Sequence, residues 1–162
     1  MFKRNIKISS FICIFICIIY CSINFSSPSL LFPLQTKYIL TSGYGYRTFD
    51  NSFHAAIDCA VAESTPVYAM HTGTVTFSGF DNSGGYMMII QYDNGYKSMY
   101  THLSSKLKFK NGERVYKGDI VGFVGPKYLE NGKLNGYTTG VHLHFALYKD
   151  GKSIDPLSLK YE

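Results

Sequence analysis

Short strand-like segments separated by glycine-containing turns make up the chain from about residue 38 onward. Besides a hairpin at residues 86–103, candidate strands lie at residues 66–70, 74–79, 119–124 and 141–148. Aromatic residues, which favour strands, make up 16% of the chain, and no segment has the apolar spacing of a convincing amphipathic helix. The pattern predicts an all-β fold, a single antiparallel β-sandwich or barrel-like domain.

The hairpin at residues 86–103 also predicts a strand register. Its Asn94-Gly95 pair is typical of a two-residue type I′ turn, because both central residues of that turn take positive φ. With this turn Met87 would lie opposite His102. Tyr100 and His102 would share one face of the second strand, because side chains alternate between the two faces.

The first 27 residues predict export. Lys3, Arg4 and Lys7 precede an apolar run from Ile8 to about Tyr20, which is the pattern of a secretory signal peptide. Extension of the run to Phe25 would give an uncleaved N-terminal membrane anchor instead. Either alternative predicts a protein in the periplasm, in the cell wall or outside the cell, released or attached to the membrane.

The domain is expected to follow a short connection. Cys21 is a candidate for lipid attachment, although Tyr20 stands where lipoprotein signals have a small residue. Residues 28–37 contain two prolines and predict a linker or extended lead-in. Residues 38–162 are then left for one domain, since the chain has no room for a second.

Charge and cysteine content exclude two other classes of protein. The net charge is +5, but without the three basic residues of the export segment 13 basic residues face 11 acidic ones, a net +2. This does not predict the clustered basic face of a nucleic-acid-binding protein. Three of the four cysteines also lie in the export segment, so only Cys59 remains in the domain and no disulfide framework is available.

Two histidines one residue apart lie in the last predicted strand, within the sequence TTGVHLHF. His142 and His144 should share one face of that strand, while Leu143, Phe145 and Leu147 share the core face. Imidazole is the commonest metal ligand and a general base near neutral pH. The alternative is a pair of half-exposed histidines without a chemical role.

A second pair of candidate ligands lies in the sequence FHAAID, where Asp58 follows His54 at a spacing of four. A catalytic zinc site has three protein ligands from histidine and carboxylate and leaves the fourth position to water. His54, Asp58 and one histidine of the later pair would form such a set. A hydrogen-bonded polar cluster without metal is the alternative.

These motifs occur with others in a fixed order: SGYGYR, FHAAIDCAV, TPVYAMHTGTV, YTHLS, GERVYKGDIVGFVG, TTGVHLHF and IDP. In that order, from about Thr41 to Pro156, the chain resembles the lysostaphin-type (LytM-like) family of zinc metalloendopeptidases, which cut peptidoglycan cross-links. The resemblance implies a groove over a site with one Zn²⁺ per domain. It assigns His54, Asp58 and His144 as metal ligands and His142 and His102 as the catalytic pair.

The resemblance also suggests that Arg47, Tyr46 or, more weakly, Tyr100 contacts substrate or the developing oxyanion. Ordinary surface packing is the alternative for Arg47 and Tyr46. The chain has no H-E-x-x-H motif with a glutamate base, so a histidine would have to take the proton.

The function implied is that of an exported zinc-dependent endopeptidase that hydrolyses peptide bonds in peptidoglycan stem peptides or cross-bridges. We expect a monomer that acts on peptidoglycan, not on nucleic acid, with membrane attachment through the N-terminal segment and a regulatory protein as further partners. The alternative is an inactive family member that binds and activates a cell-wall amidase or a morphogenesis partner.

Two departures from the family pattern are visible. Ala55 and Ala56 fill a gap where the family usually has a glycine, and alanine would be strained there if positive φ were needed. Residues 125–140 are longer than the usual connection before the second histidine motif. This insertion either shapes the groove or is a tolerated surface loop.

Overall fold

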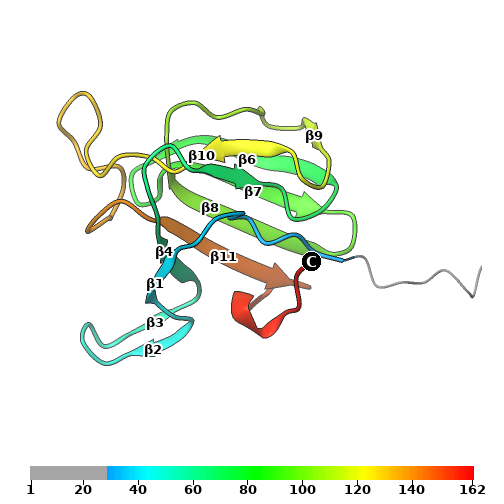
Figure 1. Cartoon of the computed structure of the whole chain (residues 1–162), viewed down its shortest axis with the longest axis horizontal. Coiled ribbons are helices and arrows are strands. Elements are labelled where there is room, and N and C mark those ends of the chain that lie inside the picture. The colour runs from blue at the N-terminus through cyan, green and yellow to red at the C-terminus, as the bar shows by residue number, and fades with distance from the viewer. Residues whose placement is uncertain (1–28) are drawn as a thin grey trace, which may run out of the picture.

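The computed structural model describes residues 29–162 (Figure 1). The signal peptide or membrane anchor predicted for residues 1–27 and the candidate lipid site at Cys21 lie outside the described residues. Within the described part of the chain, no helix has both the length and the hydropathy needed to cross a membrane.

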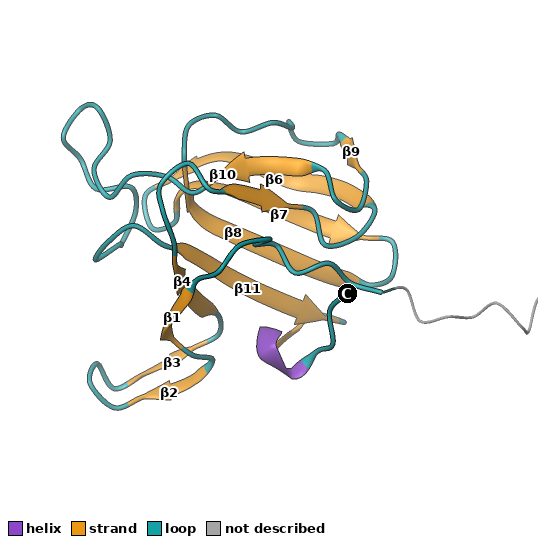
Figure 2. Ribbon diagram, in the orientation of Figure 1, coloured by secondary structure: helices purple, strands orange, loops and turns teal. Residues whose placement is uncertain are grey.

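The described residues form strands joined by loops and turns, with one short 3₁₀ helix, η1 (Figure 2). Every pairing between the named strands is antiparallel, which confirms the predicted all-β fold. The elements are β1 (Ile39–Ser42), β2 (Gly45–Arg47), β3 (Ser52–His54), β4 (Ile57–Ala60), β5 (Pro66–Tyr68), β6 (Gly73–Asp81), β7 (Gly85–Tyr92), β8 (Tyr96–Leu103), β9 (Arg114–Val115), β10 (Ile120–Phe123), β11 (Leu143–Lys149), β12 (Lys152–Ile154) and η1 (Pro156–Ser158).

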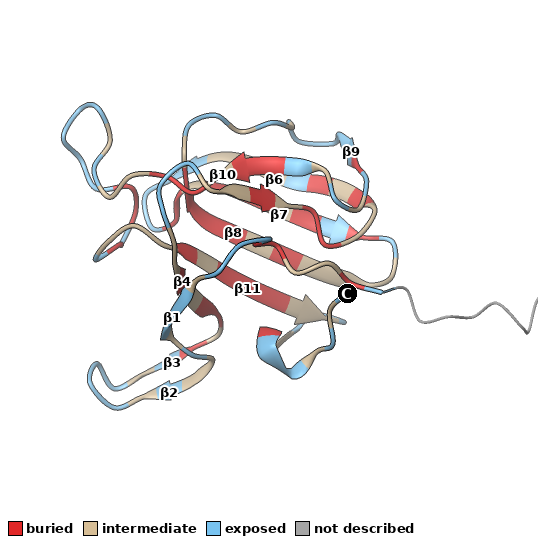
Figure 3. Cartoon of the chain, in the orientation of Figure 1, coloured by how far each residue is buried: buried red, intermediate tan, exposed pale blue. Residues whose placement is uncertain are grey.

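One large sheet organises the molecule, with strand order β1-β4-β11-β8-β7-β6-β9 and β12 added beside β11. A second sheet, β5 with β10, contributes Val67 and Val121 to the same core as Phe145 of β11 and Tyr100 of β8. The buried stretches of the central strands mark this core in Figure 3. A separate hairpin, β2 with β3, projects beyond the end of the large sheet (Figure 1).

The described part of the predicted linker packs against the domain. Leu30 and Leu34 are buried in the core. Two backbone hydrogen bonds also join the segment to the domain. Leu31 N–H donates to Met70 O, and Tyr68 N–H donates to Pro33 O, each at 3.0 Å. Residues 29–37 are therefore an extended lead-in fixed by apolar burial and backbone hydrogen bonds, not a free linker.

The predicted hairpin is present, but the predicted turn was wrong. Its loop has three residues, 93–95, because Gly95 N–H bonds to Tyr92 O at 3.1 Å and Gln91 pairs with Lys97. Of the Asn94-Gly95 pair, only Gly95 takes positive φ, at 83°. A three-residue loop with its last residue in the left-handed region shifts the register by one residue from that of a type I′ turn.

A second irregularity lies at the far end of β8. Met88 pairs with Tyr100 but Tyr86 pairs with Leu103, so two residues, Thr101 and His102, lie opposite one. His102 has φ of 58°, in the left-handed region. This β-bulge re-aims the His102 side chain, as bulges beside functional sites commonly do. Tyr100 faces the core, and the prediction that it shares a face with His102 was wrong.

Candidate metal and catalytic site

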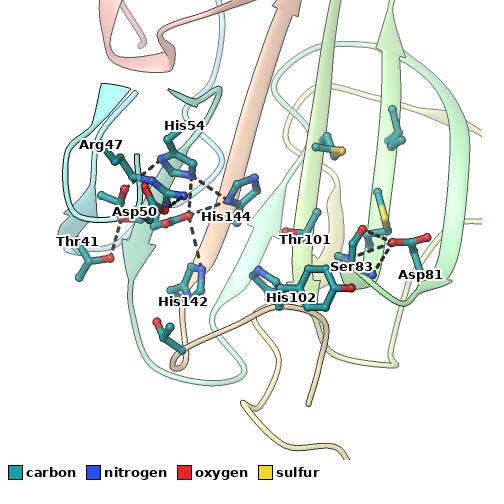
Figure 4. Close-up of a pocket in the computed structure, with 18 of the residues that line it drawn as sticks. Thr41, Arg47, Asp50, His54, Asp81, Ser83, Thr101, His102, His142 and His144 are labelled. Carbon is teal, nitrogen blue, oxygen red and sulfur yellow. Dashed lines mark hydrogen bonds and ion pairs between the residues drawn. The ribbon is translucent and has the colours of Figure 1, made fainter. Parts of the chain in front are cut away.

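A pocket of about 750 Å³ lies on the face of the large sheet opposite the core. Its floor is apolar, with Phe77, Met87, Ile89 and Met99 from β6, β7 and β8. The four histidines predicted to act in chemistry line it together with Asp58. Figure 4 shows His54, His142 and His144 converging at one end, with His102 beside them and Asp81 and Ser83 further along.

Strand pairing brings the first three candidate ligands together. Asp58 of β4 and His144 of β11 are directly opposite each other in neighbouring antiparallel strands. Such opposed side chains lie close enough to interact. His54 ends β3, and the two alanines after it connect β3 to β4. Neither alanine takes positive φ, so the condition under which alanine would be strained here is not met.

The donor atoms of these three residues form a compact triangle. His144 Nδ1 lies 2.8 Å from Asp58 Oδ1, and His54 Nε2 lies 3.3 Å from His144 Nδ1 and 3.4 Å from Asp58 Oδ1. Ligand atoms bound tetrahedrally to zinc at about 2.0–2.2 Å are about 3.3–3.6 Å apart. The donor set and its spacing therefore fit a metal ion, with small adjustment where His144 and Asp58 hydrogen-bond directly.

Surrounding contacts prepare two of these residues for metal binding. His54 Nδ1 lies 2.9 Å from Gly43 O, and a carbonyl oxygen can only accept, so Nδ1 carries the proton and Nε2 is free to bind. This is the usual outer contact of a metal-binding histidine. Burial alone would raise the pKa of Asp58, but the hydrogen bond from His144 and the nearby histidines lower it below its ordinary value. Asp58 is thus held as a carboxylate.

His142 and His102 lie beside the triangle. His142 Nε2 is 3.6 Å from Asp58 Oδ1, and the rings of His102 and His142 have centroids 4.8 Å apart. Each ring also contacts a backbone carbonyl: His142 Nδ1 lies 2.9 Å from Gly140 O, and His102 Nδ1 lies 2.8 Å from Asn135 O. Both rings therefore donate from Nδ1, and Nε2 is the unprotonated nitrogen of each neutral ring.

Burial also sets the charge of His102. Its side chain is almost fully inaccessible, and this burial lowers its pKa to about 4 despite the opposing hydrogen bond to Asn135 O. The neutral ring is therefore the form present at neutral pH.

The three weaker candidates are in different places. Arg47 lines the pocket, where it pairs with Asp50 at 2.5 Å and donates to Ser52 Oγ at 3.1 Å. Tyr46 does not line the pocket. Its side chain is 62% exposed, and its hydroxyl donates to Asn51 Oδ1.

Tyr100 was wrongly predicted to contact substrate. It is fully buried, and its hydroxyl bonds to the Tyr92 hydroxyl at 3.1 Å and to Tyr68 O at 3.3 Å. Cys59 is buried on the face away from the pocket, because it follows Asp58 in β4 and successive side chains of a strand point to opposite faces.

Sequence reasoning missed the pocket floor and Asn135. The floor residues Met87, Ile89 and Met99 could have been found from the alternation of the hairpin strands, given the correct register. Asn135 had no such signal, because it lies in the inserted loop, 33 residues from His102.

Comparison with known proteins agrees with this geometry. The model of Peptidase family M23 matches residues 52–156. DD-carboxypeptidase/endopeptidase Mpg of Neisseria meningitidis is 33% identical over 125 residues, 74% of this chain and 26% of that protein. Peptidoglycan DD-endopeptidase ShyA of Vibrio cholerae is 29% identical over 131 residues, 78% of this chain and 28% of that protein. The chain thus spans about a quarter of the length of these relatives.

A solved structure extends the agreement to the fold. The catalytic domain of the antimicrobial peptidase lysostaphin from Staphylococcus simulans superposes with a TM-score of 0.62 at 29% identity. The match covers 75% of this chain and 90% of that domain. Family model, sequence relatives and fold all give the same assignment: the chain belongs to Peptidase family M23.

Proposed function

We propose that this protein is a zinc-dependent endopeptidase that hydrolyses peptide bonds in the stem peptides or cross-bridges of peptidoglycan. The observation that carries the proposal is the grouping of three metal-donor atoms with two histidines whose ring nitrogens are oriented by backbone carbonyls. A structural histidine cluster would not need this arrangement along a pocket wall.

The metal ligands in this proposal are His54 through Nε2, Asp58 through Oδ1 and His144 through Nδ1. Zinc bound by these atoms would supply a Lewis acid for the scissile carbonyl and a nucleophile at neutral pH. The set leaves a coordination position for substrate or solvent, as catalytic zinc sites do and structural sites do not.

His142 and His102 would handle the proton. Each keeps its own proton at Nδ1, on a backbone carbonyl, so Nε2 is the atom that accepts a proton or a hydrogen bond. A chain without a glutamate base needs such a group. With two adjacent rings, one can take the proton of the attacking water while the other accepts a hydrogen bond from it, and the ring that has taken the proton can then donate to the developing charge. Arg47, with its guanidinium at the pocket wall, is a second donor for the substrate or the oxyanion.

Support for peptidoglycan as substrate comes from the relatives and from the pocket. Mpg is named as a DD-carboxypeptidase/endopeptidase and ShyA as a peptidoglycan DD-endopeptidase. A pocket of about 750 Å³ with an apolar floor accommodates several residues of a peptide, whose backbone can reach the donor cluster at one end.

The predicted location completes the proposal. Residues 1–27 would direct the protein across the membrane as a signal peptide or retain it there as an anchor, and residues 38–162 would be the peptidase domain. Peptidoglycan lies outside the cytoplasmic membrane, so export is a requirement of this function.

The experiment is digestion of purified peptidoglycan, with released fragments identified by mass. We expect cleaved cross-links or stems that disappear with a chelator and in His144→Ala. His71→Ala is the matched control, since His71 is also a partly buried histidine but does not line the pocket. A zinc-loaded wild-type protein that cuts nothing would refute the proposal and favour the alternative of an amidase-binding module.

A further inference from the structure

The inserted loop at residues 125–140 carries a fully buried side chain, Asn135, that fixes the loop to the sheet beside the site. Asn135 is fully buried, although its neighbours 131–134 are exposed. Its amide donates to Leu103 O at 2.9 Å and to Pro126 O at 3.2 Å, and its Oδ1 accepts from Tyr86 N–H at 3.0 Å. Asn135 therefore connects the loop to the ends of β7 and β8 through two backbone groups, Tyr86 N–H and Leu103 O, while its contact with Pro126 O lies within the loop.

These contacts lie at the β-bulge that aims His102. The bulge interrupts the β7–β8 ladder between the pairs Tyr86–Leu103 and Met88–Tyr100. Tyr86 and Leu103 are the two residues whose backbone groups Asn135 binds in the large sheet. A buried backbone group without a partner is destabilising, so an inserted amide that satisfies two such groups stabilises the bulge.

Two glycines provide the space for this contact. A Cβ on Gly85, which has φ of 67°, would lie 2.2 Å from Asn135 Oδ1. A Cβ on Gly125 would lie 2.3 Å from Leu103 O and 2.7 Å from Asn135 Nδ2. Any side chain at either position would push Asn135 away from the sheet.

The carbonyl of Asn135 completes the arrangement, because it accepts the Nδ1 proton of His102 at 2.8 Å. We infer that Asn135 is a positioning residue: its side chain locks the loop so that its carbonyl holds His102 in the Nδ1–H tautomer with Nε2 free. The inserted loop is then part of the catalytic framework and not a tolerated surface insertion. The role in catalysis rests on the proposed function, whereas the tautomer does not.

The test is the nitrogen NMR spectrum of the imidazole rings in the zinc-loaded wild-type protein, in Asn135→Ala and in Asn131→Ala. We expect His102 as the Nδ1–H tautomer in wild type and a mixture of tautomers in Asn135→Ala. Asn131→Ala is the matched control, because Asn131 is an exposed asparagine of the same loop whose side chain bonds only locally, to Lys133 N–H. Its spectrum should equal that of wild type.

Kinetics provide the second measurement. A positioned acid or base contributes a factor of about 10²–10⁴ to the rate. In Asn135→Ala we expect part of this factor to be lost, so that kcat falls by about tenfold or more while KM and zinc content stay unchanged. Unchanged kcat, or a fall that is matched by loss of zinc, would overturn the positioning role.

The wild-type spectrum keeps the inference testable even if Asn135→Ala does not fold. An Nε2–H tautomer of His102 in wild type overturns the inference without any substitution. If wild-type protein cuts no peptidoglycan, the proposed function fails, yet a tautomer change in Asn135→Ala would still support the role of Asn135 in orienting His102.

Discussion

Removal of zinc should lower the melting temperature of the protein strongly. The three donor residues come from β3, β4 and β11, and His144 lies 86 residues from Asp58 and 90 from His54 in sequence. An unfolded chain does not hold them together, so metal binding adds directly to the free energy of unfolding. At a free zinc concentration of about 1,000 times Kd, this contribution is about 4 kcal/mol.

The size of the described domain converts this energy into a temperature. At about 2.1 cal/mol/K for each residue, the 134 residues from 29 to 162 give an entropy of unfolding of about 0.28 kcal/mol/K. A loss of about 4 kcal/mol therefore lowers the midpoint by about 15 °C.

The assay is thermal unfolding followed by circular dichroism, with zinc content measured for each sample. Wild type and His71→Ala should show the full difference between zinc-loaded and stripped protein, while Asp58→Asn should show little. Loaded and stripped wild-type samples that melt within about 2 °C of each other would refute the idea that these three residues bind metal in the folded state.

Three further substitutions test the surroundings of the site. Tyr100→Phe should reduce the free energy of unfolding by about 1–2 kcal/mol in urea titrations, because the Tyr92 hydroxyl and Tyr68 O each lose a buried partner, and zinc content should stay the same. Met99→Ala should raise KM for a soluble peptidoglycan fragment about fivefold or more, since a partly buried methionine on the pocket floor no longer contacts substrate; an unchanged KM would argue against this floor as the binding surface. Gly125→Ala should lower kcat in steady-state assays and destabilise the fold by about 1–3 kcal/mol, because the new Cβ would displace Asn135, and wild-type kinetics would contradict that account.

The parts of the fold that depend on simple alternation were predictable from sequence. Leu143, Phe145 and Leu147 are fully buried, and His144 points to the other face, as a two-residue period requires. The choice of His144 as the partner of His54 and Asp58 came from the family resemblance, whereas the spacing of the motifs alone left open which histidine of the later pair joins them.

The parts that depend on turn and bulge geometry were not predictable. The Asn94-Gly95 pair suits both a two-residue loop and a three-residue loop, and the choice between them shifts every pair in the hairpin by one residue. The bulge then interrupts the alternation of side chains at His102, so His102 lines the pocket although Tyr100, two residues earlier, faces the core.

Long-range contacts made by irregular segments were also beyond the sequence. The segment that contains Leu30 and Leu34 was predicted from its prolines as a linker or extended lead-in, and nothing in its sequence indicated that both leucines lie in the core. Asn135 resembles any loop asparagine, and only the folded structure brings it to Leu103 and Tyr86. Periodicity predicts which face a strand residue occupies, but it carries no information about where a loop docks.

The most direct test of the account is the release of new amino groups from peptidoglycan by zinc-loaded wild type and by zinc-loaded His102→Ala. His102 is outside the metal-donor triangle, so the variant should keep one zinc per chain. The account predicts release by wild type and a rate lower by about 10²–10⁴ in the variant at equal zinc content. Equal rates for the two proteins, or no release by the zinc-loaded wild type, would contradict it.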